Sequence, residues 1–249
     1  MEDRDLTSLL RSWKYDQHSN MRQITTTDGR AVIQVRLPLG IEQYEINGRP
    51  DGQRPRDHET YLAYLEERLR LHIITNGSDR GFEVNSRDVA ELQSEGILFY
   101  YRYVLLYQLD RFDLVIRDTE HNLSLCDVLE RYCPNQEERD SVLQYQPFII
   151  RMHAAAQVKA MEKGQRIGDA GAVLREAISR IQALEPIDTP VFQLEMHRSV
   201  QHLQEMMPEN LDDGLEEALS RAVQEEDYER AAVLRDRLQA RNSRVDKER

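Results

Sequence analysis

Residues 21–46, MRQITTTDGRAVIQVRLPLGIEQYEI, decide the fold class because their pattern differs from that of the rest of the chain. Two runs, 21–27 and 31–37, are rich in β-branched residues, which favour strands. Asp28-Gly29 between them is a dipeptide that tolerates the positive φ angles of a tight hairpin turn. A third extended run, 41–46, follows after a bend. The pattern predicts a small antiparallel sheet of two or three strands, which is marginal alone and is expected to pack on helices.

Helical periodicity dominates outside this stretch. Residues 6–13 are expected to form a short helix, and from Asp57 onward apolar residues recur every three or four positions. We expect Asp57 and Ser86 to be the N-caps of the first two long helices, and the brief extended run 81–84 to add to the sheet. Later helices, bounded by prolines and glycines, are expected at 123–132, 137–145, 148–162, 170–184 and 191–206.

These elements predict an α+β fold that is predominantly α-helical. A small N-terminal antiparallel β-sheet is expected to pack on a multi-helix body, and the chain is expected to end in a C-terminal helical hairpin. The expected divisions are 1–56 for the first helix and sheet, as part of the main domain, 57–207 for the helical body and 208–242 for the hairpin. No fixed sequence period recurs, so a repeat protein is not predicted.

The composition of the 249 residues narrows the class of protein. No run approaches the roughly 20 apolar residues that a membrane-spanning helix needs, and the acidic start, residues 1–5, is unlike a signal peptide. Cys126 and Cys133 are too few for a disulfide scaffold and lack the spacing of a zinc site, so we expect buried free thiols. We therefore expect a cytoplasmic protein that uses no metal and no cofactor.

The formal net charge of −12 argues against nucleic acid as a partner, because a field of this sign repels phosphates. The densest basic stretch is the C-terminal end, from Arg235 to Arg249. Acidic residues are interleaved with the basic ones there. A solvated helix face is therefore the favoured interpretation, and direct DNA binding is the alternative.

Catalytic motifs are largely missing from the sequence. It has no phosphate-binding loop ending in Gly-Lys-Ser or Gly-Lys-Thr, no His-Glu-x-x-His zinc helix and no Gly-x-Ser-x-Gly nucleophile elbow. The best candidate carboxylates are Asp110, Asp113, Asp118 and Glu120, and two of them, such as Asp113 and Asp118, could do acid–base work if they faced one cleft. Charged residues near a helix end more often form surface ion pairs, so we expect a protein that is not an enzyme.

Two further features leave a binding role open. The turn from Gly48 to Gly52, Gly-Arg-Pro-Asp-Gly, is polar and compact and is followed by Arg54 and Arg56. It could hold an anion, although a structural double turn requires the same residue types. The helix expected after Ser86 carries a cluster of aromatic residues, which we interpret as core rather than as a platform that stacks bases, because few basic residues accompany it.

Residues 211–238 are the most informative for function. Apolar residues line one side of each of two short helices, which flank the acidic turn 225–227. The small pair Ala231-Ala232 lets the two backbones approach closely. Isolated helices of this length are marginal in water, so the apolar surface left over is expected to seek a partner or a second copy. Docking of the hairpin on its own domain is the alternative.

The spacing in this segment resembles the UVR motif of the excision-repair proteins UvrB and UvrC. The resemblance rests on Leu219-x-x-Ala222 and on the run from Asp227 to Asp236, with Leu219 where methionine is frequent and Tyr228 where phenylalanine is. In that family the motif is a helical hairpin that mediates protein–protein contact. It also occurs in Clp-type chaperone ATPases and in regulators of the bacterial stress response. The resemblance therefore implies a partner protein without naming a pathway.

The rest of the chain is similar to bacterial proteins that carry the same hairpin at their C-terminus. That likeness rests on the turn from Gly48 to Gly52, on Tyr101-Arg102-Tyr103 and on Arg117-Asp118-Thr119. It implies a bacterial origin and supplies no activity, and no helicase or nuclease signature accompanies it.

We therefore expect a non-enzymatic adaptor or regulatory protein that acts through the hairpin, with a repair protein, a Clp-type ATPase or a second copy as its partner. One alternative is an accessory factor of nucleotide excision repair with weak DNA contact. Another is an enzyme that uses the carboxylates near Asp113 and Asp118. The residues expected to form the protein-binding surface are Leu219, Ala222, Tyr228, Glu229, Ala231, Ala232, Leu234, Arg235, Asp236 and Leu238.

Overall fold

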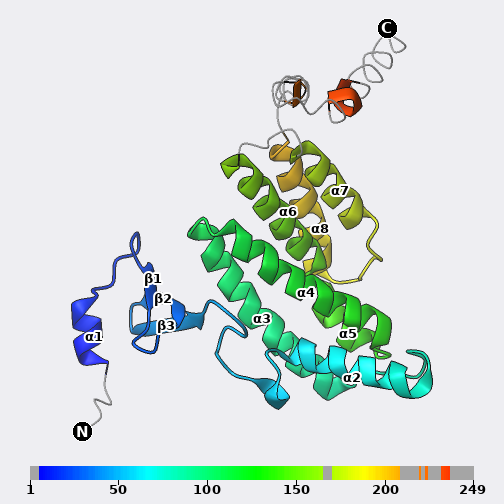
Figure 1. Cartoon of the computed structure of the whole chain (residues 1–249), viewed down its shortest axis with the longest axis horizontal. Helices are drawn as coiled ribbons and strands as arrows, with labels where there is room; N and C mark the ends of the chain where they lie inside the picture. The colour runs from blue at the N-terminus through cyan, green and yellow to red at the C-terminus, as the bar shows by residue number, and fades with distance from the viewer. Residues whose placement is uncertain (1–5, 165–169, 208–218, 220–221, 224–230, 236–249) are drawn as a thin grey trace. The chain divides into compact units, whose positions relative to one another are not determined.

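A computed structural model of the chain describes residues 6–164, 170–207, 219, 222–223 and 231–235 (Figure 1). Helices dominate these residues, and the strands lie near the N-terminus. The elements in order are α1 (Thr7–Ser12), β1 (Met21–Thr25), β2 (Ala31–Leu37), β3 (Gly40–Glu45), the 3-10 helix η1 (Pro55–Asp57), α2 (Tyr61–Asn76), α3 (Ser86–Gln108), α4 (Phe112–Tyr132), α5 (Gln136–Leu143), α6 (Gln146–Lys163), α7 (Ala170–Gln182) and α8 (Pro190–Glu205).

The chain divides into two compact units. The first contains Met1–Leu105 and Ser124–Arg139, and the second contains Leu106–Leu123 and Asp140–Arg249. Helices α3, α4 and α5 therefore contribute residues to both. The expected domain boundaries at residues 56 and 207 stay predictions.

The first unit begins with a three-stranded antiparallel sheet in the order β1-β2-β3, which confirms the predicted sheet. Gly29 has a φ of 85° in the turn between β1 and β2, as the Asp-Gly dipeptide predicts. Ile33 and Tyr44 lie opposite each other on a buried apolar face. On the other face, Gln34 accepts a hydrogen bond from the Arg22 guanidinium and donates one to Gln43. The two faces of the sheet thus differ in polarity.

The structure corrects two predicted helix caps. Thr60, not Asp57, caps α2, because the Thr60 hydroxyl accepts a hydrogen bond of 3.0 Å from the Ala63 backbone N–H. Asp57 instead lies in the left-handed region, at a φ of 63°. Asn85, one residue before Ser86, caps α3 through its side-chain oxygen. In each case the N-cap is the residue whose oxygen reaches the free N–H groups of the first turn.

The prediction that residues 81–84 add to the sheet is wrong. Of the described residues, only β1, β2 and β3 form the sheet. The Val84 backbone N–H instead donates a hydrogen bond of 2.8 Å to the carbonyl oxygen of Tyr132, at the end of α4. A backbone N–H can find its hydrogen-bond acceptor at a helix end as well as on a sheet edge. The local sequence pattern does not distinguish the two.

Two buried charged side chains of α3 hold the first unit together. The Glu95 carboxylate, wholly buried, accepts hydrogen bonds of 2.6 and 3.0 Å from the backbone N–H groups of the first two residues of α2. Two helical turns further on, the buried Arg102 guanidinium donates to the carbonyl oxygens of Glu45 and Gly48, at 2.8 and 2.7 Å. The sheet therefore packs on the helical body through α3, as expected.

The second unit is built around α6, α7 and α8, which lie side by side (Figure 1). Their contact surface is apolar and tightly packed, with Leu174, Ile181 and Leu203 fully buried. Thr189 caps α8 through its hydroxyl, which accepts from the Phe192 backbone N–H, and Pro190 occupies the first turn, as predicted.

Two histidines with lowered pKa values, the half-buried His153 and the more exposed His202, make the stability of the second unit depend on pH. Burial, with Arg180 nearby, lowers the pKa of His153 below its ordinary value of 6.5, against the opposing effect of Glu120. The His153 Nδ1 lies 2.9 Å from the Thr119 hydroxyl of α4. Burial and Arg151 lower the pKa of His202 in the same direction.

We expect the free energy of unfolding to fall as the pH drops below 6.5, because the unfolded chain then binds protons that the folded histidines do not. Denaturation of His153→Gln at a series of pH values is expected to show a shallower loss than the wild type. The exposed His197→Gln is the matched control, and an equal loss in all three chains would contradict this assignment.

Three further observations concern membrane-spanning helices, cysteines and metal sites. No helix among the described residues is long and apolar enough to cross a membrane. Cys126 and Cys133 are buried free thiols, as expected. Within the same residues, no three His, Cys, Asp or Glu side chains gather closely enough to hold a metal ion.

Candidate protein-interaction site

The described residues near the C-terminus form a small apolar cluster of their own. Ala222, Ala231 and Leu234 are buried against one another, and Leu219 packs on them. All four residues are helical, two before and two after the acidic residues 225–227 in the sequence. Because two of the three buried residues are alanines, the two helices can approach closely. We call these four residues the seam, because they pack the two helices of the hairpin against each other.

Two valines of the same segment remain half exposed. The exposed fraction is 51% for Val223 and 53% for Val233. Val233 lies about 200° around the helix from Ala231, on the side away from the seam. Val223 lies about 40° from Leu219, so it borders the seam. The hairpin therefore presents apolar side chains to its surroundings after its own seam is closed.

Comparison with known proteins gives one result for this segment. Residues 213–240 match the model of the UVR family, the UvrB/uvrC motif. They carry a UVR motif. Comparisons with curated proteins and with solved structures find no significant match to the chain. We call residues 213–240 the UVR hairpin.

The structure places six of the ten predicted surface residues. Ala222, Ala231 and Leu234 lie in the seam of the UVR hairpin, with Leu219 packed against them. Ala232 is half-buried and Arg235 is exposed. Whether these residues contact a partner stays a prediction. The other four predicted residues, Tyr228, Glu229, Asp236 and Leu238, lie outside the described residues.

Sequence reasoning missed Val233 as a surface candidate. The signal was present in the spacing, because Val233 falls between the seam positions 231 and 234, and a helix turns it to the opposite side. An apolar residue at an outer position is a small departure from an amphipathic pattern, and single exposed apolar residues are common. Only the packing of the seam shows that Val233 lies on the outer side of its helix.

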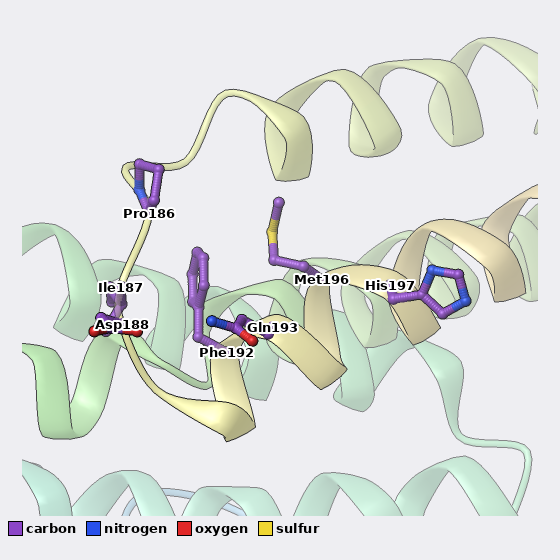
Figure 2. Close-up of a pocket in the computed structure, with 7 residues that line it drawn as sticks. All are labelled: Pro186, Ile187, Asp188, Phe192, Gln193, Met196 and His197. Atoms are coloured by element: carbon purple, nitrogen blue, oxygen red, sulfur yellow. The ribbon is translucent and has the colours of Figure 1, made fainter.

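A shallow groove lies in the same unit, where the connection from α7 meets α8. It has a volume of about 440 Å³. Figure 2 shows the Phe192 ring and the Met196 side chain on the same side of α8, facing the loop that carries Pro186, while His197 points away. Asp188 is the acidic member of the lining, which consists of Pro186, Ile187, Asp188, Phe192, Gln193, Met196 and His197. The groove is therefore mostly apolar with one acidic residue.

The carboxylates proposed for acid–base chemistry do not face one cleft. Asp113 is exposed, and its carboxylate lies 3.7 Å from Arg111. Asp118 is wholly buried and accepts from the Arg117 guanidinium at 2.8 Å. Five residues of helix separate the two, which turns their side chains about 140° apart around α4. This arrangement supplies two separate ion pairs rather than a cooperating pair of carboxylates.

Proposed function

We propose that the protein is a non-enzymatic adaptor or regulatory protein that binds another protein through the UVR hairpin. The observation that carries the proposal is the pair of half-exposed valines, Val223 and Val233, on a hairpin whose own seam is already closed. Apolar side chains left outside a closed seam are suited to contact with a partner. The match to the UVR family supports the same conclusion.

The partner that fits best is another bacterial cytoplasmic protein of the kind that UVR motifs contact, a repair protein or a Clp-type ATPase, or a second copy of this chain. Val233 would sit at the centre of the contact because it lies on the outer face of its helix. Exposed charges such as Arg235 would surround it and add specificity more than affinity.

The replacement of Val233 by aspartate tests the proposal directly. The partner is first captured from bacterial lysate by the full chain, identified by mass spectrometry and purified. Val233→Asp is then expected to bind it at least about thirtyfold more weakly, because an apolar anchor at the centre of an interface contributes about 2 kcal/mol or more. The second helix should persist, because position 233 is outside the seam.

Two controls make this result specific. Leu39→Asp makes the same kind of change at a residue of the first unit that is 94% exposed, and it should leave the affinity unchanged. A chain that ends at Met207 lacks the UVR hairpin and should not bind. Equal binding by this shortened chain would overturn the proposal.

A second candidate is an accessory factor in nucleotide excision repair that touches DNA weakly. The description of the matching family favours a repair-related role, and the basic residues between Arg235 and Arg249 would supply the phosphate contacts. Fluorescence anisotropy with a labelled duplex should then show binding at low salt that falls steeply as salt is added. No binding at low salt would exclude this candidate.

A further inference from the structure

The connection between β3 and α2 holds two adjacent residues in a costly backbone conformation. Arg56 has φ and ψ of 53° and 34°, and Asp57 has a φ of 63°. This left-handed region brings the β-carbon of an L-residue too close to the backbone, and glycine avoids that cost. Aspartate tolerates the region through its short polar side chain, whereas arginine has no such group near its backbone.

Both ends of this connection are fixed by the buried side chains of α3. Arg102 binds the carbonyl oxygens of Glu45 and Gly48 at its start. Glu95 binds the backbone N–H groups of the first two residues of α2 at its end. The loop between these points, residues 49–60, is therefore presented by a rigid support, which is how binding loops are commonly held.

The tip of the loop exposes two arginine side chains. Arg54 and Arg56 are both exposed, and within the described part of the chain neither guanidinium forms an ion pair. The imidazole of His58 donates from Nδ1 to the Arg56 carbonyl oxygen at 2.7 Å, which holds the turn in place. Arg54 reaches only the Asp57 carbonyl oxygen, at 3.4 Å. Most N–H groups of the two guanidiniums thus remain available.

An exposed arginine at a position that favours glycine requires an explanation other than packing. Backbone strain that the surrounding structure holds in place is typical of binding sites. A guanidinium offers paired N–H groups that match the oxygens of a carboxylate or a phosphate. A long polyanion is a poor candidate, because the net charge of −12 repels it.

We propose that Arg54 and Arg56 form a binding site for a single oxyanion, the carboxylate or phosphate group of a ligand. Both arginines are exposed on the strained turn. The hydrogen bonds from Arg102 and to Glu95 hold the ends of the loop in place before the ligand arrives. This site belongs to the first unit and uses no residue of the UVR hairpin, so it adds to the proposed function without depending on it.

Titration of the full chain with sodium phosphate and with sodium acetate tests the site, with sodium chloride as the control at equal ionic strength. The side-chain Nε–H signals of Arg54 and Arg56 in NMR spectra are the readout. Saturation by phosphate and not by acetate identifies a phosphate ligand, and the reverse identifies a carboxylate ligand. If neither ion shifts these signals beyond the effect of chloride, the proposal is overturned.

Glycine substitutions separate binding from structure. Arg56→Gly relieves the strain and removes the guanidinium, so Tm should stay equal or rise while the anion binds about tenfold more weakly, judged by the Arg54 signal. Asp57→Gly is the matched control, because it relieves the same strain and keeps both arginines. Asp57→Gly should bind the anion as tightly as the wild type or more tightly. Undiminished binding by Arg56→Gly would overturn the proposal, as would a lower Tm, which would give Arg56 a structural role.

Discussion

Glu95→Ala is expected to destabilise the first unit by about 3–5 kcal/mol, the cost of removing one partner from a buried charged contact. Glu95 is wholly buried, and its two oxygens satisfy the N–H groups at the start of α2. Its carboxylate also lies 3.5 Å from the buried guanidinium of Arg49. Alanine would leave all three groups without this acceptor, in a place that water reaches poorly.

Denaturation followed by tryptophan fluorescence measures this effect on the first unit. Trp13 is the one tryptophan of the chain, and its ring lies 4.0 Å below the Arg22 guanidinium of the sheet. Ser94→Ala, at the exposed position next to Glu95, is the control and should change the free energy of unfolding by no more than about 0.5 kcal/mol. A loss of less than about 1 kcal/mol in Glu95→Ala would show that the carboxylate does not hold α2 in place.

Leu234→Asp is expected to unfold the UVR hairpin and abolish partner binding while α6, α7 and α8 remain folded. Leu234 is one of three buried residues of the seam. Burial of an unpaired carboxylate there costs several kcal/mol, and two helices of this length have little stability to offset it. The expected result is the complete loss of amide-exchange protection in residues 231–235, with unchanged protection in α8.

Leu234→Met keeps the volume and the apolar character of the side chain, so it should cost less than about 1.5 kcal/mol and retain partner binding. Comparison with Val233→Asp then separates the two roles of neighbouring residues. The change at position 234 should remove both protection and binding, whereas the change at position 233 should remove binding alone. Intact amide-exchange protection of residues 231–235 in Leu234→Asp would contradict the assignment of Leu234 to the seam.

Local sequence patterns predicted the elements that depend on short-range chemistry. The sheet follows from β-branched runs and from Asp28-Gly29, whose glycine adopts the positive φ that the turn requires. The start of α8 follows from Thr189-Pro190, because the cap and the first-turn proline act on neighbouring N–H groups. The seam positions 222, 231 and 234 likewise follow from helical spacing.

The incorrect cap predictions are choices between nearby residues of similar propensity, and the incorrect strand prediction concerns a backbone partner far away in the sequence. Asp57 and Thr60 are both good N-caps, and the side chain of Glu95 selects the second by binding the N–H groups at the start of α2. Residues 81–84 form no strand, since Gly81 lies in a turn at a φ of 82° and the Val84 backbone N–H binds the carbonyl oxygen of Tyr132. Nothing within a few residues of either position reveals these partners.

The sequence by itself therefore determined the fold class, the hairpin and its UVR motif, because each depends on residue types at fixed spacing along the chain. Only the tertiary structure decided that Val233 faces outward, that Asp113 and Asp118 form separate ion pairs, and that Arg56 is held in a left-handed turn. The two ion pairs join neighbours in the sequence, but the burial of Asp118, the outward side of Val233 and the strained turn depend on packing between separate elements. The Glu95 carboxylate and the backbone of Tyr61, for example, are 34 positions apart and meet only when the chain is folded.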